Sequence, residues 1–178
     1  MKKQGFTLIE LMVVIVIMGI LAAVAVPKLF GMIAKSKASE IGPAAGTYVK
    51  LQDAFAAESG AVGSHTRIGY VLPASSNFEY TDPNSSAFTG DGTTNLGGLT
   101  AFVAHWQAKN IAKLNDCAMN SEWQVQVKQA TSSNQGVVDY AAGVNATTEG
   151  FGKSATVGNC LGLTPSFKNL STVNSTGT

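Results

Sequence analysis

The feature that most constrains this chain is a long apolar segment close to its N-terminus. Residues 6–26 carry only two polar side chains, Thr7 and Glu10, and residues 11–26 carry none. A helix of this length extends for roughly 31 Å, at about 1.5 Å per residue, which is close to the thickness of the hydrocarbon core of a bilayer. We therefore expect residues 6–27 to form one membrane-spanning helix.

The order of the residues around this segment differs from that of an ordinary secretory signal. In such a signal, a basic stretch and a short apolar core both precede the cleavage site. Here Lys2, Lys3 and Gly5 all come before the apolar segment. Basic residues at the start of a first membrane helix hold that end in the cytoplasm, so we expect the rest of the chain to lie outside it.

Glu10 is the unusual residue of the apolar segment. An ionisable side chain in a membrane helix costs up to about 3 kcal/mol and is commonly functional. A partner of opposite charge would remove this cost, and one candidate is the α-amino group that cleavage after Gly5 would create on Phe6. That amine could belong to the same chain or to a neighbouring chain. The alternative is a glutamate without a partner that reaches the membrane surface.

Residues 1–35 closely resemble the N-terminus of type IV prepilins. The shared pattern is a short basic leader that ends in Gly5, followed by FTLIE at positions 6–10 and an apolar helix. The resemblance implies that a prepilin peptidase cleaves between Gly5 and Phe6 and that Phe6 is N-methylated. It also implies that Glu10 guides the docking of a subunit into a growing fibre.

The resemblance makes residues 1–5 the cleaved leader and assigns Thr7, Gly19 and Pro27 to subunit assembly. Proline lacks an N–H and clashes with the preceding turn, so Pro27 is expected to kink the helix. Glycine weakens a helix locally. Residues 19–27 are therefore candidates for unwinding when subunits pack in a fibre, and a simple bend is the alternative.

Residues 28–58 mix charged and apolar side chains and are expected to form the amphipathic second half of the same helix. A second bend is expected at Gly42-Pro43. Four side chains have the spacing i, i+3, i+4, i+7, which places them on one helix face: Tyr48, Leu51, Gln52 and Phe55. A helix of about 50 residues is far longer than the mean in globular proteins.

The remaining residues, 59–178, are expected to form a globular head. Turn-forming residues separate short segments with alternating apolar side chains. These predicted strands are residues 68–72, 78–80, 102–108, 123–128 and 137–141. A helix over residues 100–113 is an alternative to the third strand. The predicted fold class is α+β, with a small antiparallel sheet packed on one long kinked helix, as in the type IV pilin-like fold. The last 18 residues, from Leu161, are mostly polar and are expected to end frayed.

The chain has two cysteines, Cys117 and Cys160, and both lie beyond the apolar segment. An even pair in an exported domain predicts one disulfide. Two buried free thiols in a cytosolic protein are the alternative, which the N-terminal segment disfavours. In many pilins, a disulfide near the C-terminus encloses a variable surface loop, and the order along this chain is similar.

Composition and motifs exclude several kinds of chemistry. The net charge is +1, and without Lys2 and Lys3 the 12 basic side chains fall to 10 against 11 acidic ones, so we infer no nucleic-acid partner. The sequence has two histidines, His65 and His105, and neither has metal-ligand spacing. His105 alternates with the apolar side chains of its predicted strand, so we expect it at the surface. We predict no metal, no cofactor and no enzymatic activity.

The sequence therefore predicts a structural subunit that polymerises with copies of itself into a type IV pilus, a fibre for adhesion, motility or related surface functions. Its other expected partners are the prepilin peptidase, the pilus assembly platform and the inner membrane, which holds the precursor before it enters the extracellular fibre. The nearest alternatives are a pseudopilin of a type II secretion system and a minor pilin. A membrane-anchored monomeric binding protein or enzyme would need neither cleavage after Gly5 nor Glu10.

Overall fold

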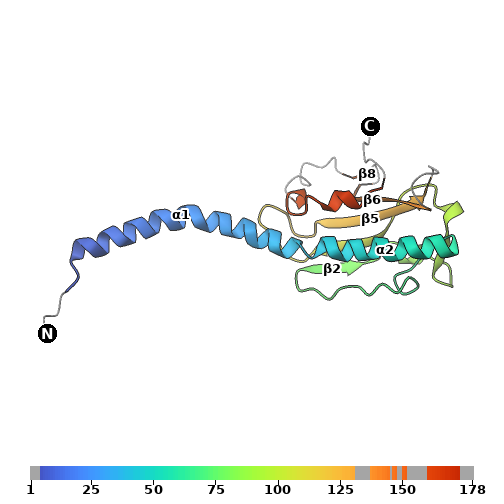
Figure 1. The fold of residues 1–178 in the computed structure, drawn as a ribbon, viewed down its shortest axis with the longest axis horizontal. Helices are drawn as coiled ribbons and strands as arrows, with labels where there is room; N and C mark the ends of the chain where they lie inside the picture. Colours follow the sequence, from blue (N-terminus) through green and yellow to red (C-terminus); the bar gives the residue numbers. More distant parts are fainter. Residues whose placement is uncertain (1–4, 131–136, 145, 148–149, 152–159, 173–178) are drawn as a thin grey trace.

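The protein consists of a long bent N-terminal helix and an α+β head. A computed structural model describes all residues except 1–4, 131–136, 145, 148–149, 152–159 and 173–178. Helix α1, Leu8–Ala38, extends away from the head, and helix α2, Ile41–Ser59, lies along the head (Figure 1). The predicted α+β class and the long helix are confirmed.

Helix α1 remains helical through its proline and curves along its length (Figure 1). Pro27 lies inside the helix. Because proline has no N–H, the carbonyl oxygen of Ala23 loses its hydrogen bond from that position, which permits a bend. Residues 19–27 are helical in the single chain, so their unwinding stays a prediction for the fibre.

The long helix is interrupted once, slightly before the second bend that was expected at Gly42-Pro43. Ser39 and Glu40 form a turn between the two helices. Pro43 therefore lies in the first turn of α2, where a backbone N–H has no partner within the helix and its absence costs little. The bend needs no broken hydrogen bond in the interior of α2.

The main sheet of the head has four antiparallel strands in the order β2-β4-β5-β6. These strands are β2, Phe78–Thr81; β4, Val103–Asn110; β5, Glu122–Gln129; and β6, Val138–Val144. Two smaller pairs flank it, β1, Ala61–Gly63, with β3, Thr93–Asn95, and β7, Ala146–Thr147, with β8, Gly150–Phe151. Single turns of 3₁₀ helix occur at Ser85–Ala87, Leu96–Gly98 and Phe167–Leu170.

This arrangement decides two local predictions in the head, and a third falls on residues outside the described ones. The strand expected at residues 68–72 is wrong, because the chain turns there at Gly69, which has a φ of 73°. The alternative helix at 100–113 is also wrong, since β4 occupies that segment. The C-terminal segment is packed at least as far as Phe167, which is 1% exposed, and the end of the chain that was expected to fray, residues 173–178, lies outside the described residues.

The core lies between α2 and the main sheet. The buried side chains of α2 recur at helical spacing: Ile41, Ala45, Tyr48, Gln52 and Ala56. All of these except Gln52 pack in one hydrophobic cluster with sheet residues such as Trp106 and Trp123. Of the predicted face, Tyr48 and Gln52 are buried, while Leu51 and Phe55 are half-buried.

The buried amide of Gln52 connects α2 to β1. With its amide nitrogen facing the carbonyl oxygen of Gly63, Gln52 donates there at 3.0 Å and accepts from the Gly63 N–H at 2.9 Å. A Cβ atom at Gly63 would lie 2.9 Å from the Phe55 ring and 2.8 Å from Ile68. Glycine is therefore required at this position, because the strand passes too close to α2 for a side chain.

The expected surface position of His105 is wrong. Its side chain is fully buried, with the ring 4.6 Å from the ring of Phe88 and Nδ1 3.3 Å from Oδ1 of Asp82. Asp82 and Phe88 belong to the segment between β2 and β4, which covers this side chain. The register of β4 against β5 also shifts between Ala104 and Trp106, next to the histidine. The strand alternation was correct, but a second layer of chain covers the residue.

The other histidine, His65, is held between two tyrosine rings. Its ring centroid lies 5.5 Å from that of Tyr48 and 5.3 Å from that of Tyr70. Its Nε2 lies 2.7 Å from the carbonyl oxygen of His105. A carbonyl oxygen only accepts, so Nε2 carries a proton and donates. Burial lowers the pKa of His65 below its ordinary value, and the bond to His105 opposes part of this effect.

We expect the head to lose stability in mild acid because of His65. Below about pH 6.5 the unfolded chain binds a proton that the folded chain disfavours. The free energy of unfolding should therefore fall as the pH drops below that value, and this contribution levels off below the lowered pKa. Urea unfolding at several pH values measures the effect. His65→Gln, whose amide can still donate to His105, should show a smaller change between pH 7.5 and 5, and an identical change would contradict the assignment.

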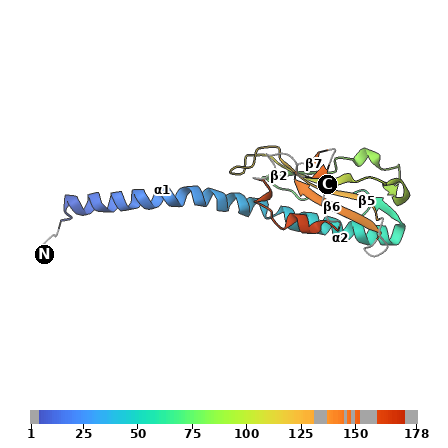
Figure 2. The ribbon, with the colours of Figure 1, turned by 90° about the horizontal axis from the view of Figure 1, so that it is seen from above.

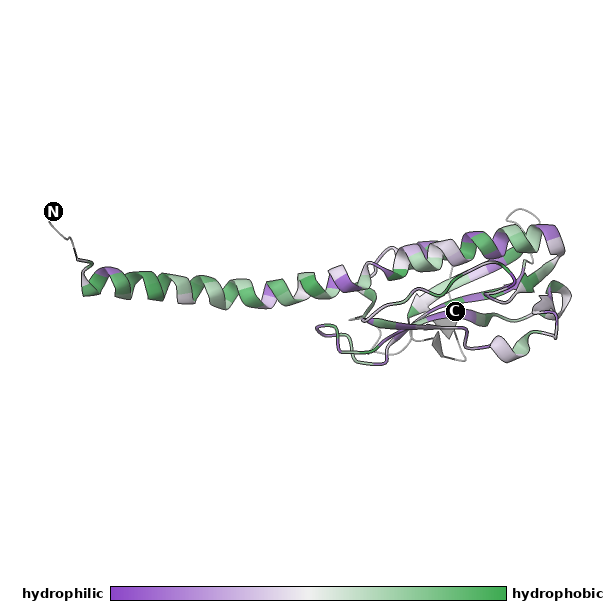
Figure 3. Ribbon diagram, turned by 90° about the horizontal axis from the view of Figure 1, so that it is seen from below, coloured by the Kyte–Doolittle hydropathy of each residue, from purple (hydrophilic) through white to green (hydrophobic). Residues whose placement is uncertain are grey.

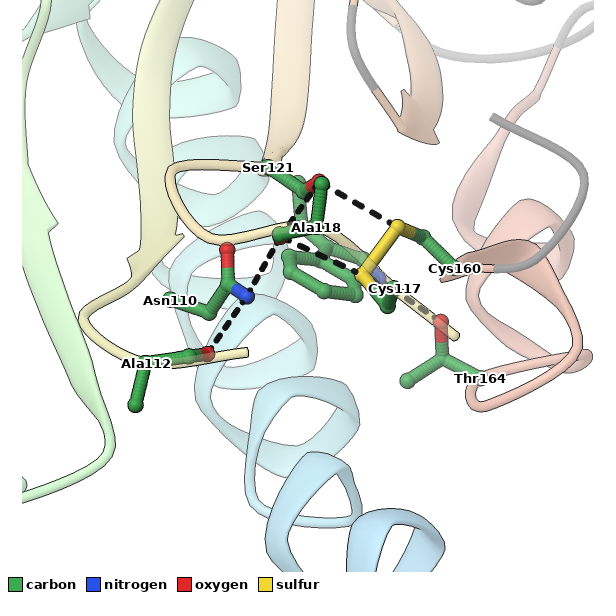
Figure 4. Close-up of a disulfide and its surroundings, with 8 residues drawn as sticks. Asn110, Ala112, Cys117, Ala118, Ser121, Cys160 and Thr164 are labelled. Atoms are coloured by element: carbon green, nitrogen blue, oxygen red, sulfur yellow. Dashed lines mark hydrogen bonds between the residues drawn. A yellow bond between two sulfur atoms is a disulfide. The ribbon is translucent and has the colours of Figure 1, made fainter. Parts of the chain in front are cut away.

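The two cysteines form the expected disulfide. The Cys117–Cys160 bond joins the loop between β4 and β5 to the chain before the last 3₁₀ turn, and both residues are fully buried. Figure 4 shows how the loop is held, since the Asn110 amide donates to the carbonyl oxygens of Ala112 and Ala118, both at 2.8 Å. The disulfide lies in the head, away from the free part of α1.

Candidate functional site

Most of helix α1 exposes apolar side chains with no cover from the described chain. The exposed fractions of its large apolar side chains run from 76% at Leu8 to 43% at Ile33, and only Ala34 and Ala38 are buried. Figure 3 shows the ribbon of α1 coloured as hydrophobic along most of the part that projects from the head. Apolar patches above a few hundred Å² on a soluble monomer mark membrane or protein contacts. In length and composition this helix could cross a membrane.

A capping box closes the N-terminal end of α1. Thr7 is the N-cap, and its side chain accepts a hydrogen bond from the Glu10 N–H at 3.3 Å. In return, the Glu10 carboxylate accepts from the Thr7 N–H at 2.9 Å and from the Thr7 hydroxyl at 2.7 Å. The box satisfies two backbone N–H groups that the helix itself cannot. Thr7 and Glu10, separate predictions from the sequence, thus form one unit.

The charge of Glu10 is not neutralised within the part of the chain that the structure describes. Both bonds from Thr7 are to the same carboxylate oxygen, Oε2, and no ion pair to Glu10 is present among the described residues. Lys2 and Lys3 lie outside the described residues. A carboxylate that enters an apolar environment needs a cation or a proton. The carboxylate is therefore available to a partner.

The bond between Gly5 and Phe6 is open to a protease. Residues 5–7 are exposed and precede the helix. A Cβ atom built on Gly5 meets no atom within 4 Å. Proteases bind extended chain more readily than helix. The local structure therefore fits a processing site immediately before the capping box.

Gly19 and Pro27 lie farther along α1 and do not join the Thr7–Glu10 unit. A Cβ atom at Gly19 would contact nothing within 4 Å, so the exposed helix surface simply lacks a side chain at this position. Small residues of this kind let membrane helices approach closely. At Pro27, a shallow apolar groove of about 260 Å³ is lined by Ala25, Val26, Lys28, Leu29 and Met32. Both features could receive a neighbouring helix.

The comparisons with known proteins concern this end of the chain. Residues 1–26 match the family model of the prokaryotic N-terminal methylation motif. The type IV major pilin protein PilA of Myxococcus xanthus (strain DK1622) is 56% identical over 39 residues, covering 22% of this chain and 18% of that protein. The type IV major fimbrial protein FimA of Dichelobacter nodosus is 54% identical over 39 residues, covering 22% and 25%. The similarity lies over the N-terminus.

The matched segment thus spans a quarter or less of these relatives, and the head lies beyond it. The motif includes the residues that the structure places at the open end of α1: Gly5, Phe6, Thr7 and Glu10. Pro27 lies just beyond the motif. The described residues contain no group of three or more histidine, cysteine or acidic side chains that could hold a metal ion.

The reciprocal bonding of Thr7 and Glu10 was not foreseen, although the sequence carried its signal. Thr7 and Glu10 have the T-x-x-E spacing of a capping box, immediately before an apolar run. The position of Glu10 in a membrane segment predicts a need for a charged partner, but it does not predict this local role. A glutamate here can do both, since a capping bond uses one carboxylate oxygen and leaves the other accessible.

Proposed function

We propose that this chain is a structural subunit of a type IV pilus and that it polymerises through α1. The observation that carries the proposal is the uncovered apolar surface of α1. The methylation motif, which matches residues 1–26, includes the first part of this helix. A lone membrane anchor explains the apolar surface but not the motif. The names of the relatives, major pilin and major fimbrial protein, support the pilus over a secretion pseudopilus.

The same surface serves the subunit in two environments. Before assembly, lipid covers the apolar residues 6–27 in the inner membrane, with the head outside. In the extracellular fibre, α1 helices of other copies replace the lipid, and packing between helices offsets the loss of lipid contact. This exchange requires no catalytic residue, cofactor or nucleic acid.

Processing supplies the charge that docking uses. A prepilin peptidase cleaves between Gly5 and Phe6, and N-methylation of Phe6 leaves its amine able to carry a proton. The assembly platform then brings this cation close to Glu10 of another copy. The pair enters the fibre core without a net charge, which lowers the cost of burying either group. Thr7 keeps the carboxylate at the helix end.

The processing steps make a direct prediction for the subunit in fibres. Mass spectrometry of protein sheared from the cell surface should give a mature N-terminus at Phe6 that carries one methyl group. Abundant fibres of this form would support a major pilin. A processed chain confined to the membrane fraction would favour a pseudopilin or a minor pilin. An intact Met1 without any fibre pool would refute polymerisation.

A further inference from the structure

Strand β6 is at the edge of the main sheet, where one side of its backbone has no neighbouring strand among the residues that the structure describes. It pairs with β5 on one side only. All seven of its residues are buried. An exposed edge of this kind pairs readily with another chain, and proteins commonly blunt or cover it. The question is what covers β6.

The outer backbone groups of β6 are bonded to two hydroxyl-bearing residues near the C-terminus. The Tyr140 N–H donates to Thr172 Oγ1 at 2.8 Å, and the Thr172 N–H donates to the Tyr140 carbonyl oxygen at 3.0 Å. The Ala142 N–H donates to Ser171 Oγ at 2.9 Å, and that hydroxyl donates to the Ala142 carbonyl oxygen at 3.4 Å. Ser171 and Thr172 thus satisfy four groups that a further strand would use.

Residues 167–172, here called the cap segment, are anchored upstream of these bonds. The Phe167 ring lies 6.2 Å from that of Trp106, and Leu170 reaches α2 beside Gly46. Figures 1 and 2 show the 3₁₀ turn of this segment, in red, close to β6 and α2. At its end, however, three of the four bonds to β6 depend on side-chain hydroxyls, and Thr172 is exposed. The end of the cap segment can therefore detach while its start stays packed.

The uncovered edge would be complementary to itself. In an antiparallel pair of β6 strands, Tyr140 can face Ala142 of a second copy, so that each N–H meets the other carbonyl oxygen. Ala141 then faces its own counterpart at the two-fold axis, where two small side chains fit. Asp139 faces Gly143, which avoids the destabilising contact of like charges. A two-fold contact of this kind is closed and needs only one surface.

We propose that the outer edge of β6 is a strand-pairing surface for β6 of a second copy, and that the cap segment keeps it closed. The inference does not depend on the pilus function, since it concerns the head alone. Its physical basis is that Ser171 and Thr172 form hydrogen bonds with the backbone N–H and carbonyl groups of both Tyr140 and Ala142. A cap held by hydroxyls blocks pairing between two heads for as long as it stays in place.

Amide hydrogen exchange of the full chain in detergent tests the proposal. The variant Ser171→Ala/Thr172→Val keeps side-chain size but removes the hydroxyls. At low protein concentration, the amides of Tyr140 and Ala142 should exchange roughly tenfold faster than in the unchanged chain. At high concentration their protection should return, because a second β6 takes the edge. In the unchanged chain, both rates should be independent of concentration.

A second substitution separates edge pairing from contacts through α1. Ala142→Pro, added to the double variant, removes the N–H at the edge and should abolish the concentration dependence. Unchanged exchange in the double variant would refute the cap. Faster exchange at every concentration, or protection that survives Ala142→Pro, would refute β6 pairing. In the same experiment, protection of the β5 amides shows that the head remains folded. If the β5 amides lose protection in the double variant, the single variant Thr172→Val is used in its place.

Discussion

Chains with Glu10→Ala should be cleaved and methylated at Phe6 but should form no fibres. In the proposed fibre, the Phe6 amine of one copy and Glu10 of another are buried together. Removing one member of a buried ion pair costs about 3–5 kcal/mol, because the other charge is left without a partner. The cost recurs at every subunit, so fibre yield should fall below detection. Electron microscopy and quantification of sheared protein measure the yield, and mass spectrometry of the membrane fraction measures processing.

Two matched variants distinguish the charge of Glu10 from its capping role. Glu10→Gln removes the charge but keeps an acceptor at the same position of the capping box. Thr7→Val removes the cap hydroxyl, at about 1 kcal/mol, but keeps the charge. We expect no fibres from Glu10→Gln and fibres from Thr7→Val. Normal fibres from Glu10→Gln would show that docking does not require the charge.

The N-terminal part of the molecule could be predicted because its signals are local. A membrane-length apolar run is decided by composition alone. The Thr7–Glu10 contact also joins residues only three apart, although it was not among the predictions. The effect of Pro27 also follows from its own covalent structure. The exact position of the second bend did not follow from the sequence, because the helices separate at Ser39-Glu40, just after α1 begins to pack against the head at Ala34 and Ala38.

The errors in the head have a different cause, which is packing between distant segments. Alternation predicted β4, β5 and β6 correctly, but it treated His105 as exposed because it could not show that Phe88 covers that ring. The segment at 68–72 has strand composition, yet Gly69 allows a turn that places Tyr70 against α2, where its hydroxyl donates to Ala44 at 3.1 Å. No sequence pattern indicated that the C-terminus would close the edge of β6.

The cysteine pair was predicted from composition and compartment, and its position in the structure indicates a large stability effect. The double variant Cys117→Ala/Cys160→Ala should lower the free energy of unfolding of the head by about 4 kcal/mol, the loop-entropy value for a closed loop of this size. The bonded residues are 43 apart in the sequence. Chemical denaturation of the oxidised chain and the double variant measures the difference, and each single variant should lose a similar amount.

Hydrogen exchange can show where this stability acts. If the disulfide works only by restricting the unfolded chain, the folded double variant keeps the native exchange rates of Tyr140 and Ala142. If it also tethers the cap segment, those two amides exchange faster while the amides of β5 keep their relative protection. We expect the second result, because Cys160 lies just before Thr164, which accepts a hydrogen bond from the buried Trp123 indole at 2.8 Å. A loss of less than about 1 kcal/mol in unfolding free energy, far below the loop-entropy value, would contradict a stabilising role for the bond.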